Sequence, residues 1–462
     1  MEYTDVSTMK PTQVLASFCA NLCYADLPDR VVDHAKMAVL DTLGCALGTH
    51  AEDPERVRII LQVARHLGAQ GDAGVIHSGL RTSAPVAALA NGVACHGIDF
   101  DDLHAGALTH TSCVILPAAL ASAEEADGSG RDFITSFVLG FEIAVRVGMA
   151  VMPSHYEHWH STATNGTFGA AAAAGKNYGL DAGQHVNALG FSGTQAAGLL
   201  AYLEFGDYTK SLNPGKSAFN GVLSALLARA GATAPPDMLE NPKGYASAYS
   251  AAPRMQELLR GLDGGPMAWE ILNNMPKPFP SLSASHTAME ATLRLVADHG
   301  LRPADIRRIV VYTYDTVVSH FSGRRIDNPM AARLSVPYCV AVCAALRRAG
   351  LEAFRPDVIR SAAVQAMLEK VEIVAEPRLN ALYPGALAAR VEIATVGGQV
   401  HEHEIHHAKG SPGNPFSMNE MQEKFERLAA PTIGAEQAAR IVAMVEGLEH
   451  VGRIRDFSHL FA

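Results

Sequence analysis

The chain has 462 residues, of which 48% are hydrophobic and 18% charged, and its formal net charge at neutral pH is −10. Because one hydrophobic core stops growing well below this length, we expect two domains, and the composition is typical of a globular protein rather than a disordered or fibrous one. The negative charge argues against general nucleic-acid binding, since phosphate backbones attract clustered lysines and arginines and the chain has no such block.

The seven cysteines show neither disulfide nor zinc spacing. Cys19 and Cys23, like Cys339 and Cys343, are four residues apart in apolar segments with helical periodicity and are predicted to be buried thiols. Residues 1–11 lack the apolar core of a signal peptide, and no uninterrupted apolar run reaches the roughly 18 residues that a membrane span needs. We therefore expect a reduced, cytoplasmic protein without a membrane partner.

Helical periodicity dominates the first half of the chain. Residues 12–128 give successive helical segments, among them 31–47, and further helices are predicted at 131–152, 166–176, 181–190 and 218–231. The 166–176 segment is almost entirely Gly and Ala, which predicts a central helix with closely packed neighbours. Glu142 and Arg146 have the spacing of a weak surface ion pair. No strand-like alternation occurs before about residue 300.

The pattern changes after Pro276. Strands are predicted at 306–314, 388–396 and 399–406, with Gly397-Gly398 as a hairpin turn, and helices at 331–349 and 355–371. A capping box at Ser417 begins another helix, which reaches residue 428. The predicted fold is mainly α, with a large all-helical domain formed by residues 1–275 and 406–462 and a smaller α+β lid domain formed by residues 276–405.

A compact polar segment, residues 96–110, lies between two apolar helical stretches. It contains three aspartates and three histidines within fifteen residues. Carboxylates beside imidazoles can move protons near neutral pH, because each group shifts the pKa of the other. The alternative is a solvated loop with helix-capping aspartates.

Four other polar segments accompany it, at residues 158–162, 210–217, 277–286 and 409–415. His160 precedes the Gly/Ala helix, where it can cap the helix or help to bind an anion. Residues 210–217 read as a loop with two lysines before a helix, but they lack the spacing of a phosphate-binding P-loop. Each lysine taken alone is most simply a solvated surface residue.

Taken together, these segments resemble the MmgE/PrpD family, which includes 2-methylcitrate dehydratases, cis-aconitate decarboxylases and iminodisuccinate epimerases. The resemblance spans nearly the whole chain in order. The matching motifs are Asp41-Thr-Leu-Gly44, Asn91-Gly-x3-His-x2-Asp-Phe-Asp-Asp102, His110 to Leu116-Pro117, Gly140-Phe-Glu-x3-Arg146, His160-Ser-Thr162, Lys210 to Ala218, Lys277-Pro-Phe-Pro280, Leu334-Ser-Val-Pro-Tyr338 and Lys409-Gly-Ser-Pro-x-Asn-Pro415.

The resemblance implies a helical domain with an α+β lid, a homodimer, a site in the cleft and no required cofactor or metal. Its catalytic residues fall on Asp99, His110, His160, Lys210 and Lys277. We also expect substrate-binding side chains in the same segments, namely Asp102, Thr109, Ser161, Lys216, Ser281 and His286.

Two departures from the family pattern bear on the reaction. Leu103 stands where decarboxylases of the family carry a threonine, and the family's site tyrosine has no clear counterpart, since Val318 falls near its position. Tyr314 and His320 are two alternative candidates for the place of that tyrosine.

The predicted function is a cofactor-independent lyase acting on a small anionic di- or tricarboxylate by dehydration or decarboxylation. Lys210 and Lys277 would stabilise the carbanion, while His110 or His160 would transfer the proton and Asp99 would orient one imidazole. One alternative is an epimerase or isomerase of a dicarboxylate such as iminodisuccinate. Another is a metal-dependent hydrolase using Asp99, Asp101, Asp102 and His104, because hard cations favour carboxylates.

Overall fold

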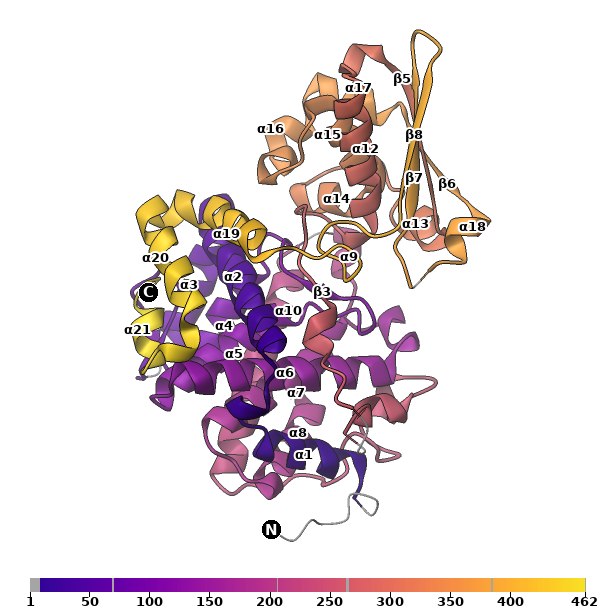
Figure 1. The fold of residues 1–462 in the computed structure, drawn as a ribbon. Coiled ribbons are helices and arrows are strands. Elements are labelled where there is room, and N and C mark those ends of the chain that lie inside the picture. The colour runs from indigo at the N-terminus through magenta and orange to yellow at the C-terminus, as the bar shows by residue number, and fades with distance from the viewer. Residues whose placement is uncertain (1–8, 69, 206, 263–265, 384, 462) are drawn as a thin grey trace. The chain divides into compact units, whose positions relative to one another are not determined.

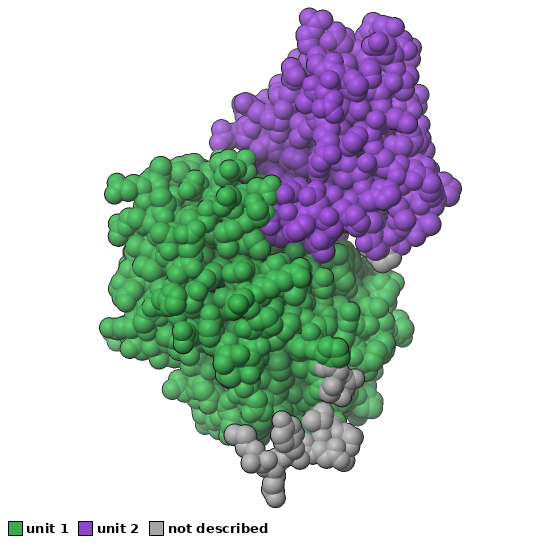
Figure 2. All heavy atoms as spheres, viewed as in Figure 1, with its two compact units in different colours: residues 1–202, 208–274, 417–462 green, residues 203–207, 275–416 purple. Residues whose placement is uncertain are grey.

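The chain divides into two compact units (Figures 1 and 2). The computed structural model describes residues 9–68, 70–205, 207–262, 266–383 and 385–461. Unit 1 comprises Met1–Tyr202, Tyr208–Asn274 and Ser417–Ala462, and unit 2 comprises Leu203–Asp207 and Met275–Phe416. Relative to the expected domain ranges, Leu203–Asp207, Met275 and residues 406–416 therefore belong to unit 2.

Unit 1 is built almost entirely from helices. Its helices are α1 (Pro11–Asn21), α2 (Asp29–Glu52), α3 (Pro54–Leu67), α4 (Ala84–Cys95), α5 (Ser112–Glu125), α6 (Gly130–Val151), α7 (Ser161–Asn177), α8 (Ala182–Gln195), α10 (Thr209–Arg229), α11 (Tyr245–Tyr249), α19 (Met418–Ile433), α20 (Ala435–Glu446) and α21 (Ile454–Ser458). Its strands β1 (Ala73–Gly74), β2 (Arg81–Thr82) and β3 (Leu103–His104) have two residues each, and α9 (Tyr202–Phe205) and β4 (Asn274–Met275) lie where the ranges of the two units meet. The expectation of an all-helical first half is thus correct apart from these short strands.

The Gly/Ala helix α7 is central, as predicted. Residues 161–175 are all buried, and α7 packs against α5, α6, α8 and α10. Gly140 of α6 faces Gly169 of α7 so closely that a Cβ at Gly140 would lie 2.8 Å from the Gly169 carbonyl oxygen. Because glycine and alanine have little or no side chain, the backbones of these helices can approach one another closely at the centre of unit 1.

The expected loop at residues 210–217 is helical and belongs to α10, so that prediction is wrong. Pro214 lies inside the helix, and a Cβ at Gly215 would lie 2.5 Å from the carbonyl oxygen of Leu89 in α4. The packing of α4 against α10 thus outweighs the turn propensity of Pro-Gly, which is a local preference only.

Helix α6 contains a second correction. Among the described residues it is long and apolar enough to cross a membrane by length and composition, but its apolar stretch is completely buried in unit 1. Glu142 and Arg146, expected at the surface, are fully buried, with Arg146 Nη2 3.3 Å from Glu142 Oε2. Arg146 also donates to the carbonyl oxygens of Arg260 and Ala268, and Glu142 accepts from the Ile271 amide. This pair holds Arg260, Ala268 and Ile271 against α6.

The C-terminal helices return to unit 1. The Ser417 capping box begins α19 as predicted, because Ser417 and Glu420 satisfy each other's amides. Helix α19 packs on α2, where Gly44 and Gly48 lie against Phe425 and Leu428. Cys23 is exposed rather than buried, whereas the other six cysteines are buried.

Unit 2 contains a four-stranded sheet in the order β6-β5-β7-β8. The strands are β5 (Ile306–Thr313), β6 (Val371–Ala375), β7 (Ala389–Thr395) and β8 (Val400–Ile405), so the three predicted strands are confirmed. Strand β5 runs parallel to β6 and antiparallel to β7, and β7 forms a hairpin with β8. The helices are α12 (His286–Asp298), α13 (Asp315–His320), α14 (Pro329–Leu334), α15 (Val336–Leu346), α16 (Pro356–Ile359), α17 (Ala362–Leu368) and α18 (Pro377–Asn380).

Two helix predictions in unit 2 are corrected. The expected 331–349 helix is divided at Ser335, which caps α15 through the Tyr338 amide, with Pro337 in the first turn. Residue 371, expected at the end of a helix, instead begins β6, which was not predicted. Strand β6 is short and mostly exposed, so its sequence lacks a clear alternation of apolar and polar residues, and its pairing with β5 is visible only in the fold.

Candidate active site

The polar segment 96–110 is folded into the interior of unit 1 and is not a solvated loop. Asp99, Asp101 and Asp102 are at most 1% exposed. Asp99 has a φ of 53°, in the left-handed region that Asp tolerates better than most residues. Buried carboxylates require partners, because desolvation penalises the charged form.

Asp99 is paired with Lys210. Its Oδ1 lies 2.6 Å from the Lys210 Nζ, and both side chains are almost fully buried. Lys210 lies in the first turn of α10, so the helical conformation of residues 209–217 places the ammonium at this position. The pair joins the polar segment to α10.

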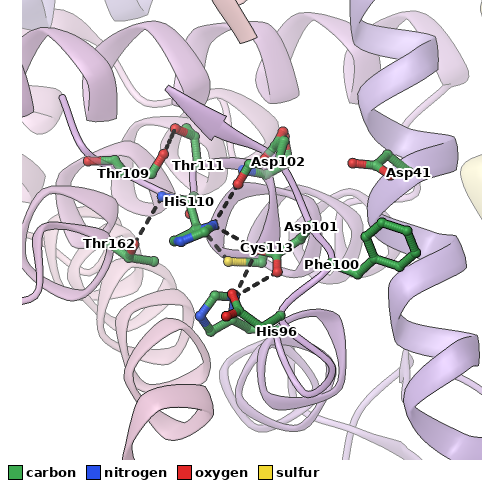
Figure 3. A network of polar contacts seen from close by, with 12 residues as sticks. Asp41, His96, Phe100, Asp101, Asp102, Thr109, His110, Thr111, Cys113 and Thr162 are labelled. Atoms are coloured by element: carbon green, nitrogen blue, oxygen red, sulfur yellow. Dashed lines mark hydrogen bonds and ion pairs between the residues drawn. The ribbon is translucent and has the colours of Figure 1, made fainter. Parts of the chain in front are cut away.

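Asp101 lies between two imidazoles, as Figure 3 shows. Both of its oxygens are 2.8 Å from His96 Nδ1, and its Oδ2 is 3.6 Å from His110 Nδ1. The rings of His96 and His110 have centroids 4.7 Å apart. Asp101 thus holds the Nδ1 edge of His96 and faces that of His110, while the imidazole-orienting role expected of Asp99 stays a prediction.

The hydrogen bonds of His110 define its tautomer. Its Nδ1 is 2.7 Å from the Asp102 carbonyl oxygen, and because a carbonyl oxygen only accepts, Nδ1 carries a proton. The backbone amide of His110 donates to Thr162 Oγ1 at the start of α7. The His110 side chain is 13% exposed, more than His96 or Asp101. Proton exchange at this ring is thus directed to Nε2.

His160 is the N-cap residue of α7, and its Nδ1 lies 3.0 Å from Asn213 Nδ2 of α10. Its ring centroid is 6.2 Å from that of His96. Burial, followed by the neighbouring His96 and Lys210, lowers the pKa of His160 well below its usual value. His160 is therefore neutral at physiological pH.

Asp102 anchors the segment. Its carboxylate accepts from the amide and hydroxyl of Ser112 and from Asn274 Nδ2 at 2.7 Å. Burial, and then the charge of Asp41, raises the pKa of Asp102 to about 7, against the effect of these donors. Its contacts are those of a structural residue, and its expected contact with substrate stays a prediction.

Two further hydroxyl groups that are predicted to bind substrate donate hydrogen bonds to backbone carbonyl oxygens. Thr109 Oγ1 donates to the Ala107 carbonyl oxygen at 3.0 Å, and Ser161 Oγ donates to that of Leu108. Lys216 is half-buried on α10. In unit 1 the structure thus brings Asp99, His110, His160 and Lys210 into one cluster, and Thr109 and Ser161 support it.

The remaining predicted residues belong to unit 2. Lys277 is 2% exposed, Ser281 Oγ is 2.9 Å from Ser285 Oγ, and His286 Nε2 is 3.2 Å from the Ser281 carbonyl oxygen. Tyr314 is buried and stacked on Tyr383, with ring centroids 4.6 Å apart. Their roles toward substrate stay predictions.

A second buried charge pair supports the segment from behind. Lys424 of α19 pairs with Asp41 of α2, donates to the Phe100 carbonyl oxygen at 2.9 Å, and places Nζ 4.1 Å from the centre of the Phe100 ring. Both charged side chains are buried. Asp41 was recognisable from its motif, but nothing in the local sequence indicates Lys424, which lies 324 residues after Phe100.

One group of side chains has the composition of a metal site. Donor atoms of His96, Asp99, Asp101 and His110 lie within 4.8 Å of one another. However, Asp99 already pairs with the Lys210 ammonium and Asp101 with His96, so a divalent cation would have to compete with these partners. Asp102 and His104 of the predicted metal alternative are outside the group, and His104 Nε2 instead lies 3.3 Å from Glu270. The donor set fits an ion-pair network better than a metal.

Sequence reasoning did not name His96 and Asn213 as site residues, and it named Asp101 only as a ligand in the metal alternative. His96 and Asp101 lie in the motif that contains Asp99, and Asn213 lies in the segment that begins at Lys210. Their presence in these motifs was the available signal, but their mutual contacts are visible only in the fold.

Comparison with known proteins agrees with the motifs. The chain matches the MmgE/PrpD N-terminal domain over residues 13–258 and the MmgE/PrpD C-terminal domain over residues 279–450. It is 28% identical to the cis-aconitate decarboxylase-like protein oryM of Aspergillus oryzae, covering 95% of this chain and 94% of the relative. It is 27% identical to the cis-aconitate decarboxylase of Homo sapiens, covering 95% and 92% of the two chains. The Aspergillus terreus cis-aconitate decarboxylase is 28% identical over 72% of this chain and 71% of its own.

These relatives support a lyase, and the two domain matches together cover most of the sequence. The chain belongs to the MmgE/PrpD family.

Proposed function

We propose that the protein is a cofactor-independent lyase acting on a small tri- or dicarboxylate, and that a cis-aconitate-like tricarboxylate is its first candidate substrate. The observation that carries the proposal is the buried cluster in unit 1, where the Lys210–Asp99 pair lies among the imidazoles of His96, His110 and His160. The relatives named for cis-aconitate supply the substrate class.

The chemistry of such substrates explains the charged groups. A polycarboxylate needs cations to enter a buried site, and charge develops on it when a bond to carbon breaks. Lys210 is a buried ammonium in unit 1, and Lys277 is a buried lysine of unit 2. We assign Lys210 to a carboxylate of the substrate, where low water content strengthens the interaction. For Lys277 the same role is proposed from its motif alone.

In the decarboxylation, the bond between a substrate carbon and its carboxylate breaks, and carbon dioxide leaves. The electron pair stays on the substrate as a carbanion delocalised over the adjacent double bond and stabilised by the lysines. A protonated imidazole then transfers its proton to carbon, and solvent restores the proton to the imidazole.

His110 is the better proton donor of the two predicted histidines. Its Nδ1 proton is held by the Asp102 carbonyl oxygen, and the nearby Asp101 carboxylate favours the charged ring. His160 is neutral because burial and the neighbouring Lys210 ammonium disfavour its charged form, so it serves as a hydrogen-bonding group that positions the substrate.

Dehydration or epimerisation is the second candidate, and one residue favours it. Leu103 in β3 is apolar and half-buried, where decarboxylases of the family have a threonine hydroxyl. A substrate with a different group at that place, such as a 2-methylcitrate-like hydroxy acid or iminodisuccinate, suits this change.

The test is turnover of purified protein with cis-aconitate, 2-methylcitrate, citrate and iminodisuccinate, followed by proton NMR and carbon dioxide release. We expect an alkene product together with carbon dioxide. Release of water alone would assign a dehydratase, exchange of a single proton an epimerase, and no turnover of any of the four would refute the proposal.

Single variants assign the residues. His110→Gln should lower kcat by roughly a hundredfold or more, whereas Lys210→Met should raise KM as well. His450→Ala, at a side chain that is 75% exposed, is the control and should behave as wild type. Activity should survive dialysis against EDTA; loss that only a divalent cation restores would promote the metal alternative.

A further inference from the structure

We propose that His96 and Asp101 are positioning residues for proton transfer by His110, with Asp101 accepting a hydrogen bond from His96 and acting on the His110 ring through its charge. This inference rests on the proposed function, in which His110 is the proton donor. Neither residue is among the five predicted catalytic positions.

The geometry of Asp101 is the first argument. Its carboxylate is fully buried and has one imidazole nitrogen at 2.8 Å and another at 3.6 Å (Figure 3). A carboxylate only accepts, so His96 Nδ1 carries a proton that it donates to Asp101. This donation fixes the rotation of the carboxylate, and the same carboxylate faces the Nδ1 edge of His110.

The second argument is the state of His96. Burial lowers the pKa of its ring despite the opposing charge of Asp101, so the ring is neutral with its proton on Nδ1. Its Nε2 is buried and has no hydrogen-bond partner among the described residues. A buried polar atom without a partner costs roughly 1–3 kcal/mol, which a ring serving only as packing would not need to incur.

The Asp101 carboxylate interacts with both the His96 and the His110 ring, so a change at one ring alters the charge that the other experiences. The donated proton of His96 satisfies part of the Asp101 charge, and the rest is available to stabilise protonated His110. Removing the donor should therefore increase the proton affinity of the Asp101–His110 pair, and removing the charge should decrease it. Coupled groups of this kind titrate as a pair.

Other ionisable groups around these rings come from each packed helix and would be common to all variants. They are Asp99 and Asp102 of the same segment, Asp41 of α2, Cys95 of α4, Cys113 of α5, His160 of α7 and Lys210 of α10.

The test is the pH profile of kcat/KM for three variants. In His96→Phe the ring volume is kept but the donor is lost, so the basic limb should move up by roughly 0.5–1 pH unit. In Asp101→Asn the charge is lost, and the limb should move down by roughly 1–3 pH units. His96→Asn keeps an N–H donor near the Nδ1 position and should keep the limb of the wild type.

A second readout does not need a substrate. Imidazole NMR of the full chain, with the His110 signal identified by its loss in His110→Gln, gives the titration midpoint of His110 directly. We expect the same opposite shifts in His96→Phe and Asp101→Asn. If no carboxylate is turned over, the proposed function fails, and this titration still decides the roles of His96 and Asp101.

A His110 midpoint that stays at the wild-type value in both variants would overturn the inference, as would equal shifts in His96→Phe and His96→Asn. If His96→Phe is not recovered as folded protein, Asp101→Asn and His96→Asn decide by the same criterion: the first must shift downward and the second must not.

Discussion

Replacing Lys424 by Met should destabilise unit 1 strongly and selectively. The substitution keeps most of the side-chain volume but removes the ammonium that pairs with Asp41, donates to the Phe100 carbonyl oxygen and lies over the Phe100 ring. Asp41 would then keep a carboxylate in the interior without its cation. The perturbation is therefore electrostatic, with little change in packing.

The magnitude follows from burial. The side chains of Lys424 and Asp41 are 1% and 0% exposed, so solvent cannot replace the lost partner. Removing one member of such a buried pair costs about 3–5 kcal/mol in unfolding free energy. Because the same change also releases Phe100, which lies between Asp99 and Asp101 in the sequence, turnover should fall as well.

The chain offers a selective assay. Its two tryptophans, Trp159 and Trp269, both belong to unit 1, so tryptophan fluorescence during urea denaturation reports the unfolding of that unit. Circular dichroism at 222 nm would report both units together. The fluorescence transition of Lys424→Met should move to lower urea, and the denaturation slope m should stay that of the wild type.

A double-mutant cycle separates the pair from other effects. In Asp41→Asn/Lys424→Met neither charge remains, so the double variant should be more stable than the sum of the single losses predicts, by about 1–3 kcal/mol. A loss below about 1 kcal/mol in Lys424→Met, or strict additivity in the cycle, would refute the view that the buried charges act as a unit.

Three further predictions use the same structure. Asp102 has a pKa of about 7 in the folded chain against roughly 4 unfolded, so the unfolding free energy should fall as pH rises from 4 to 7, by up to roughly 4 kcal/mol. Asp102→Asn should reduce the difference in unfolding free energy between pH 5 and pH 8, measured by fluorescence-monitored urea denaturation. Part of the difference should remain, because burial also raises the pKa of Glu142 to about 7. A difference equal to that of the wild type would contradict the assignment. Gly140→Ala should cost about 1–3 kcal/mol by overpacking α6 against α7, whereas Gly452→Ala, which meets nothing within 4 Å, should not, and equal midpoints would contradict the packing argument. Native protein should react with one equivalent of a thiol reagent at Cys23 and with seven after unfolding; two or more fast thiols would show that the burial of the other cysteines is wrong.

Much of the secondary structure could be predicted, because period and capping are local properties. The alternation of residues 388–396 predicted β7, and the Ser417 capping box predicted the start of α19. The errors occur where tertiary contacts decide. The 210–217 segment contains Pro-Gly but is helical because Gly215 packs on α4, and Glu142 and Arg146 look like a surface pair until α6 is surrounded.

The grouping of four candidate residues could be predicted from the sequence, but the contacts among them could not. Motifs identified Asp99, His110, His160 and Lys210, which lie together in unit 1. They did not show that Asp99 pairs with Lys210, or that Asp101 accepts a hydrogen bond from His96 and lies 3.6 Å from His110 Nδ1. Partnerships between Lys210 of α10 and side chains of the segment that joins α4 to α5 depend on how the helices pack, which the order of residues along the chain does not specify.

The order in which the ribosome makes the chain gives the α2–α19 contact a biosynthetic consequence. Unit 1 is interrupted by Met275–Phe416, so α19, with Phe425, Leu428 and Lys424, is synthesised after all of unit 2. At 5–20 residues per second, that interval lasts roughly 7–30 s. During this time the Gly44 and Gly48 face of α2 lacks the helix that covers it, and the Phe100 carbonyl lacks its lysine. A nascent chain ending at Asn274 should therefore be a chaperone client, and the buried cluster around Asp99 and Lys210 should form only once α19 has left the exit tunnel.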